Sequence, residues 1–205
     1  LAALPQLEEY AGWLAGPAID RGLLGPGEAD RIWTRHLVNC ALLLPLLPAS
    51  GTICDLGSGA GLPGVVLAIA RRDLSIVLLE PLLRRAVFLE EVVDDLALKN
   101  VTVVRDRAED YARSHPRHDV AVARAVAPLP QLLRWALPLV GPEGTVLALK
   151  GEKAAEELAA AAALLEREGV VDQEVLTLGQ GGNVTHAVRV VRPRAFQNHR
   201  ATEDR

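Results

Sequence analysis

The sequence predicts an α/β fold built around a doubly wound, mostly parallel β-sheet. Between residues 52 and 167, apolar runs with strand character alternate five times with segments of helical periodicity. Alternation of this kind produces parallel strands with helices on both faces of the sheet. Two strand-like runs then follow, separated only by the turn at 179–182, which is too short to contain a helix. That final pair must be antiparallel, so we expect seven strands in all.

The first 48 residues are expected to form a helical extension that packs on the main domain. Helices are predicted over residues 5–15 and 28–47, the second beginning after a Gly-Pro-Gly cluster. In the second helix, Arg35 and His36 follow Arg31 closely enough for two or three of these side chains to share one helix face. A solvated face is the simpler interpretation of that pattern.

The main domain is expected to span residues 49–193. Its first strand, residues 52–56, leads into a glycine-rich loop and a helix over 65–70. The later elements are strands over 75–80, 101–104, 118–124 and 144–150, helices over 82–96, 129–139 and 152–167, and final strands over 170–178 and 184–191. Residues 194–205 form a basic tail that we expect to be flexible.

Composition limits the class of protein. A chain of 205 residues, 50% of them hydrophobic, is long enough for one well-buried core and short for two. No apolar run approaches the roughly 20 residues of a membrane span, and the first residues lack the basic and apolar pattern of a signal sequence. Cys40 and Cys54 offer neither a disulfide framework nor metal-ligand spacing. We expect a cytoplasmic monomer with no membrane partner and no metal.

The loops after the strands should hold the ligand, because open α/β sheets bind ligands outside the carboxyl ends of their strands. A dinucleotide fingerprint would require a third glycine at position 62, which is Leu62 here; the glycine falls at Gly61 instead. This spacing disfavours an NAD-dependent oxidoreductase. The pattern Asp-x-Gly-x-Gly-x-Gly, which starts at Asp55, is typical of class I S-adenosylmethionine-dependent methyltransferases with a Rossmann-like fold.

S-adenosylmethionine gives each strand end a chemical task. The glycines let the backbone approach the amino-acid part and the ribose. Asp55 can accept a hydrogen bond from the ammonium group, directly or through water. Glu80 can accept both ribose hydroxyls, and Ala108 and Glu109 are placed to read the adenine edge.

Several segments together resemble the ribosomal RNA small subunit methyltransferase G family, also called glucose-inhibited division protein B. They are residues 55–64, 84–89, 124–125 and 148–151, preceded by the Arg35-His36 pair. The resemblance runs from about residue 31 to residue 191. It implies methylation of N7 of one guanine of 16S rRNA, close to the decoding centre. The implied partner is 16S rRNA or the 30S subunit.

The resemblance also implies roles for individual residues. The implied cofactor contacts are Gly57, Leu62, Ala108, Glu109 and Arg124. From position and chemistry we add Asp55, Gly59, Gly61 and Glu80 to the predicted cofactor site. The predicted RNA contacts are Arg35, His36 and Lys150.

Methylation at N7 needs no general base, because this nitrogen carries an exposed lone pair. Alignment and desolvation of the reacting pair can suffice, so His36 is not expected to act in acid–base chemistry. Arg124 is the best candidate for a positioning residue that faces both cofactor and target; the alternative is a buried ion pair with Asp55 or Asp119. Lys150 could hold a phosphate or a guanine edge, or cap the sheet edge.

Some features depart from the family pattern or leave alternatives open. Asn39-Cys40 stands where the family often has Asp-Ser, and the connection over residues 22–27 replaces elements usual upstream. Trp33, Trp135 and Phe196 are the options for base stacking, with Trp135 better explained as core. A methyltransferase of this fold acting on a protein or small molecule, and a non-catalytic RNA-binding module, remain alternative functions.

Overall fold

The computed structural model describes residues 3–194 and has one seven-stranded sheet with strand order β3-β2-β1-β4-β5-β7-β6. The strands are β1 (Gly51–Leu56), β2 (Leu74–Leu79), β3 (Val101–Val104), β4 (His118–Arg124), β5 (Val140–Lys150), β6 (Gln173–Gln180) and β7 (Asn183–Val191). Strands β1 to β5 pair in parallel, and β7 is antiparallel to both β5 and β6. The predicted fold class and the antiparallel final pair are therefore confirmed.

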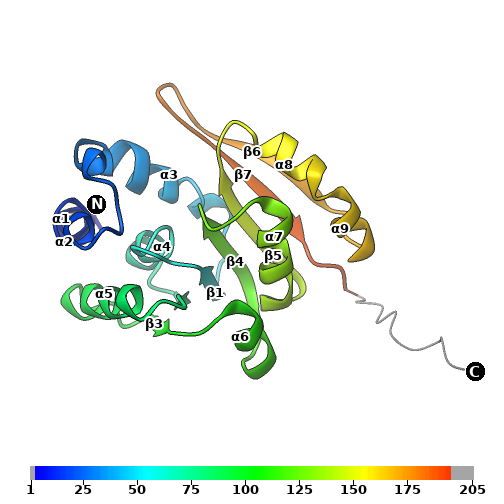
Figure 1. Ribbon diagram of the computed structural model, residues 1–205, viewed down its shortest axis with the longest axis horizontal. Coiled ribbons are helices and arrows are strands. Elements are labelled where there is room, and N and C mark those ends of the chain that lie inside the picture. Colours follow the sequence, from blue (N-terminus) through cyan, green and yellow to red (C-terminus); the bar gives the residue numbers. More distant parts are fainter. Residues whose placement is uncertain (1–2, 195–205) are drawn as a thin grey trace, which may run out of the picture.

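Helices cover both faces of the sheet, as Figure 1 shows. On one face lie α1 (Leu4–Ala15), α2 (Pro17–Asp20), α3 (Val38–Ala41), α4 (Gly64–Ala70) and α5 (Leu83–Asp95). On the other lie α6 (Ala108–Ser114), α7 (Leu129–Ala136), α8 (Ala154–Ala160) and α9 (Ala162–Arg167). Each layer buries its own apolar cluster against the sheet. Among residues 3–194, no helix is both long and apolar enough to cross a membrane.

The prediction of one continuous helix over residues 28–47 is wrong. The chain instead forms a 3-10 turn η1 (Pro26–Arg31), a wide π-helical turn η2 (Ile32–Leu37), the short α3, and a second 3-10 turn η3 (Leu44–Leu46). Pro45 lacks the N–H that a continuing helix needs. Smaller breaks divide the predicted helix over 152–167 at Ala161 and replace the end of 129–139 with the 3-10 turn η4 (Leu137–Leu139).

The strand order reverses between β1 and β4, which are neighbours at the centre of the sheet. Connections leave these two strands toward opposite faces, so a crevice opens at their carboxyl ends. The glycine loop after β1 and the segment after β4 border this crevice.

Candidate active site

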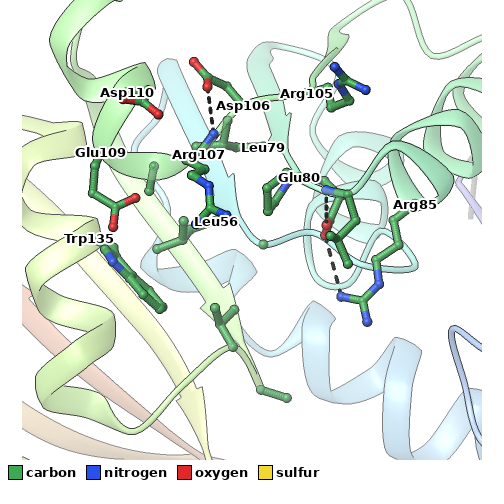
Figure 2. Close-up of a pocket in the computed structure, with 16 residues that line it drawn as sticks. Leu56, Leu79, Glu80, Arg85, Arg105, Asp106, Arg107, Glu109, Asp110 and Trp135 are labelled. Atoms are coloured by element: carbon green, nitrogen blue, oxygen red, sulfur yellow. Dashed lines mark hydrogen bonds and ion pairs between the residues drawn. The ribbon is translucent and has the colours of Figure 1, made fainter.

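A cavity of about 660 Å³ opens at the carboxyl ends of β1, β2 and β3. Its walls come from the ends of these strands, from the start of α6, from the segment after β4 and from α7, as Figure 2 shows. Of the predicted cofactor residues, those that line it are Gly57, Glu80, Ala108 and Glu109. We call this space the first cavity.

The glycine loop is shaped by close approaches that a side chain would prevent. Gly57 has φ +68°, and a Cβ built on it would meet Val126 at 3.0 Å. At Gly61, with φ +97°, a Cβ would lie 2.6 Å from Val65 and 2.8 Å from the Tyr10 hydroxyl. That hydroxyl donates to the carbonyl oxygen of Ala60 at 2.8 Å. A tyrosine of α1 therefore supports the loop from behind.

Glu80 ties the loop to the opposite wall of the first cavity. Its Oε2 accepts the backbone N–H of Gly59 at 3.0 Å, and its Oε1 accepts that of Leu82, also at 3.0 Å. Arg85 lies 3.9 Å from the same carboxylate, as the dashed line in Figure 2 marks. A carboxylate has about four acceptor positions, so Glu80 retains capacity for hydroxyl donors in the cavity.

Asp55 lies below the loop, outside the lining of the first cavity. Its side chain is fully buried, and Oδ2 accepts the backbone N–H of Gly64 at 3.0 Å. Burial raises the pKa of this carboxyl to about 7, although the Gly64 hydrogen bond acts in the opposite direction. In the structure this carboxylate braces the start of α4, because the loop folds over it. The hydrogen bond from a ligand to Asp55 stays a prediction.

At the far end of the first cavity, Ala108 and Glu109 open helix α6, and Trp135 of α7 faces them. Trp135 is half-buried: it packs against the apolar cluster on its own face of the sheet and also lines the cavity. Figure 2 shows the Glu109 carboxylate beside its indole ring. The prediction that Trp135 is core describes only part of its position. Its place on the helix after β4 could have indicated from sequence that it also lines the cavity.

The acceptors and the lining of the first cavity fit an adenosine-containing cofactor. Gly57 has no side chain to block approach along the loop, and the Glu80 carboxylate offers acceptors for ribose hydroxyls. The Trp135 ring supplies an apolar surface for a base. Gly59, Gly61 and Leu62 lie outside this lining, and their contacts with the cofactor stay predictions.

A second cavity, of about 570 Å³, lies beside the first. Its lining includes the predicted RNA-contact residues Arg35 and Lys150 and also Arg124. The other polar lining residues are Asn39, Glu152, Glu157, Thr185 and His186. The two cavities share Ala125, which follows β4 and has the left-handed φ of +54°. The ends of β4, β5 and β7 thus meet a turn of the N-terminal extension at this point.

Arg124 does not form the ion pair with Asp55 or Asp119 that was considered as an alternative. Its guanidinium contacts Nδ1 of His36 and donates to the Cys40 sulfur at 3.5 Å. Asp119 instead accepts the backbone N–H of Thr52 at 2.8 Å. Burial raises the pKa of the Cys40 thiol to about 11, against the lowering influence of Arg124.

His36 is buried, whereas Arg31 and Arg35 are exposed, so the solvated-face interpretation holds for the two arginines and not for the histidine. The contact of His36 with RNA stays a prediction, which this burial does not favour. Only 4% of the residue is exposed, and both ring nitrogens have partners, Nε2 pairing with Oε2 of Glu28 at 2.7 Å. Burial, and next the charge of Arg124, lower the pKa of His36. Arg35 is exposed and bonds the other oxygen of Glu28 at 2.9 Å.

Lys150 links two segments at the floor of the second cavity. Its Nζ donates to the carbonyl oxygen of Ala127 at 2.8 Å and to Oε2 of Glu157 at 2.7 Å. The same Glu157 oxygen accepts the backbone N–H of Leu129. Two of the three ammonium donors are therefore used within the protein.

The first cavity also has two arginines for which the sequence predicted no role. Arg105 and Arg107 follow β3 and are exposed at the cavity, as Figure 2 shows. Within residues 3–194, neither guanidinium has a recorded ion pair, whereas the exposed Arg113 pairs with Asp110 and Arg167 pairs with Glu168. The run Arg105-Asp106-Arg107 directly after a strand could have indicated from sequence that these arginines lie at the site.

Known proteins match this chain over most of its length. The family model for rRNA small subunit methyltransferase G matches residues 3–187. A protein of Streptomyces avermitilis named ribosomal RNA small subunit methyltransferase G is 54% identical over 172 residues, covering 84% of this chain and 72% of its own. One of the same name from Thermobifida fusca is 53% identical over 189 residues, covering 92% of this chain and 79% of its own.

Solved structures at lower identity share the fold. The apo form of the S-adenosylmethionine-dependent methyltransferase SibL has a TM-score of 0.62 at 20% identity, covering 81% of this chain and 57% of its own. A ribosomal protein L11 methylase from Lactobacillus delbrueckii subsp. bulgaricus has a TM-score of 0.57 at 15% identity, covering 76% of this chain and 77% of its own.

Proposed function

The chain belongs to the rRNA small subunit methyltransferase G family, and we propose that it transfers a methyl group from S-adenosylmethionine to N7 of one guanine of 16S rRNA, near the decoding centre. The observation that carries this proposal is the family match, which extends over residues 3–187 and includes both cavities. The sheet topology with its final antiparallel pair is in accord with it.

The proposed cofactor site is the first cavity. When bound, S-adenosylmethionine supplies an electrophilic methyl group on its sulfonium. Glu80 accepts hydrogen bonds from the ribose, Gly57 admits the ligand close to the backbone, and Ala108 and Glu109 hold the adenine. Support for these roles comes from the lining of the cavity and from the acceptor capacity of Glu80.

The proposed acceptor site is the second cavity, because it adjoins the first at Ala125. A guanine bound there presents N7 toward the cofactor without first losing a proton. Arg124 positions it by donating to O6, a contact that a guanidinium makes well. The protein's contribution is alignment and exclusion of water, with no residue acting as a base.

The rRNA substrate is expected to approach over the exposed arginines. Arg105 and Arg107 beside the first cavity, and Arg35 beside the second, supply cations for phosphate groups. Lys150 retains one donor for an RNA group. Beyond the rRNA itself, we propose the assembled 30S subunit as the physiological partner, a monomeric enzyme, and a cytoplasmic location, where ribosomal subunits are found.

The proposed organisation is a helical extension over residues 1–48 and a cofactor-binding domain over 49–193. The tail at 194–205, and with it Phe196, falls outside the described residues except for Arg194, which pairs with Glu143 at 3.0 Å.

The decisive experiment supplies the protein with labelled S-adenosylmethionine and with 30S subunits or 16S rRNA that lack the modification. Chemical cleavage at 7-methylguanine, read by reverse-transcription stops, then locates the product. One enzyme-dependent stop is the expected result. Gly57→Val is the matched control, because its side chain would be strained at φ +68° and would meet Val126, so cofactor binding should be lost. If the label appears only in protein, or if neither the rRNA of the 30S subunits nor free 16S rRNA is labelled, the proposal is rejected.

A further inference from the structure

Arg124 is held at the junction of the two cavities by a chain of hydrogen bonds that begins in the N-terminal extension. Glu28 of η1 contacts His36 of η2, and His36 contacts Arg124 at the end of β4. These residues come from three separate elements. Nothing in the sequence connects positions 36 and 124.

The hydrogen-bonding capacity of each group fixes which one donates and which one accepts in these hydrogen bonds. A guanidinium only donates hydrogen bonds, so Nδ1 of His36, which faces Arg124, must be the acceptor. The proton of the neutral ring is then on Nε2, where it donates to Oε2 of Glu28 at 2.7 Å. Burial and the charge of Arg124 lower the pKa of His36, which agrees with a neutral ring.

The partner of Arg124 matters for its charge. Within the described part of the chain, Arg124 has no recorded ion pair, and its two contacts are an imidazole nitrogen and a thiol. A carboxylate at the place of His36 would orient the guanidinium equally well but would neutralise it. A neutral imidazole orients it and leaves the positive charge available to the second cavity, which Arg124 lines.

We propose that His36 is a positioning residue, which Glu28 holds as the Nε2–H tautomer so that its Nδ1 aims the charged Arg124 guanidinium into the second cavity. The consequence for catalysis rests on the proposed function, whereas the hydrogen-bond chain itself does not. His36 orients the group that meets the acceptor base and touches no substrate itself.

The first test is spectroscopic and needs no substrate. In protein labelled with ¹⁵N at histidine, long-range ¹H–¹⁵N correlation separates protonated from unprotonated ring nitrogens, and the spectrum of His36→Gln identifies the His36 signals. A protonated Nε2 with an unprotonated Nδ1 is expected at neutral pH. A protonated Nδ1, or a rapidly averaged mixture of tautomers, overturns the proposal.

The second test is a double-mutant cycle between His36→Gln and Arg124→Ala. In the wild-type background, His36→Gln should lower kcat for rRNA about tenfold, a coupling of the size expected for contacting residues. The dissociation constant for S-adenosylhomocysteine should change by less than about twofold, because His36 lies outside the first cavity. In the Arg124→Ala background, His36→Gln should have no further effect. A full tenfold loss in that background refutes positioning through Arg124.

A matched control is available at the other end of the same strand. His118 of β4 is also buried and bonds the Tyr111 hydroxyl at 3.1 Å, away from both cavities. His118→Gln therefore makes the same change and should leave kcat unaltered. If His36→Gln does not fold, Glu28→Ala replaces it, since Glu28 is a partly exposed side chain. This variant should lower kcat several-fold, and an unchanged kcat contradicts the proposal.

The two proposals can fail separately. If the wild-type protein methylates no rRNA, the proposed function falls while the tautomer measurement still tests the hydrogen-bond chain. If rRNA is methylated but the cycle shows no coupling, only the role of His36 is rejected.

Discussion

Glu80 and Gly59 are joined by a hydrogen bond in which the Gly59 backbone N–H donates to Oε2 of the glutamate at 3.0 Å. The other carboxylate oxygen accepts the backbone N–H of Leu82, and the residue is only 1% exposed. One buried carboxylate therefore holds the glycine loop against the start of α5. The shape of the first cavity depends on both oxygens being acceptors.

Replacing Glu80 with glutamine should weaken cofactor binding. The amide group of Glu80→Gln would face one of the two backbone N–H donors, leaving it without an acceptor. A hydrogen bond to a charged group is worth about 1.5–3 kcal/mol, so affinity for S-adenosylhomocysteine should fall at least about tenfold. Calorimetry measures this, with Glu90→Gln on the exposed surface of α5 as control. Equal affinities in both variants would contradict the role given to Glu80.

The buried Asp55 should make stability depend on pH. Burial raises its pKa to about 7, above the value of about 3.9 in an unfolded chain. As pH rises from about 4 to about 7, the unfolded state ionises first, so the free energy of unfolding falls over this range and then levels. The stabilisation is complete at acid pH and is lost as pH passes the folded-state pKa.

Asp55→Asn removes this titration and keeps an oxygen for the Gly64 N–H. The melting temperature of the variant, relative to that of the wild type, should therefore rise between pH 5 and pH 8. Each kcal/mol corresponds to roughly 2–4 °C for a chain of this size. Differential scanning calorimetry across this range checks it, with exposed Asp94→Asn as control for loss of one charge. Parallel curves for Asp55→Asn and wild type would be the contrary result.

Charge reversal at Arg105 and Arg107 should weaken rRNA binding in a salt-dependent way. Each arginine that contacts a phosphate contributes about 0.7–0.9 to the slope of log affinity against log salt. The double variant should reduce this slope by up to about 2, with the affinity loss greatest at low salt. Filter binding to 30S subunits at several salt concentrations measures the slope. Arg167→Glu on α9 should leave it unchanged, and an equal loss there would indicate a nonspecific charge effect.

Removing the Tyr10 hydroxyl should destabilise the glycine loop, to which it is hydrogen-bonded. Tyr10→Phe leaves the carbonyl of Ala60 without its donor in a fully buried site, at a cost of about 1–2 kcal/mol. Affinity for S-adenosylhomocysteine should fall about threefold to tenfold, together with the melting temperature. Tyr111→Phe removes a second buried hydroxyl, bonded to His118. It should lower the melting temperature alone; loss of affinity in both variants would show that the effect is not specific to the loop.

The sheet could be predicted from sequence because residues close together in the chain define each strand. Each strand is an apolar run bounded by turn residues, and the short turn at 179–182 alone requires an antiparallel pair. The bent segment at 26–46 could not be predicted in the same way. Its helical spacing is genuine, but His36 turns inward to meet Arg124, a residue 88 positions later.

The site was predictable at the level of which loops take part. Glu80, Ala108 and Glu109 lie after strands and line the first cavity. Asp55 instead lies inside β1, in register with Leu78 of β2. It sits beneath the loop, because α4 packs its Gly64 backbone directly over the carboxylate. Strand ends locate a site, whereas long-range packing decides which side chains face it.

The hydrogen bond from Tyr10 to Ala60 also bears on how such a protein can be divided or recombined. A fragment starting at residue 49 would lack the hydroxyl that supports its own cofactor loop, and the space beside Gly61 would lose its wall. The helical extension is therefore not an interchangeable accessory. Exchange of this segment between related enzymes should retain full cofactor affinity only when the incoming helix carries a tyrosine at the matching position.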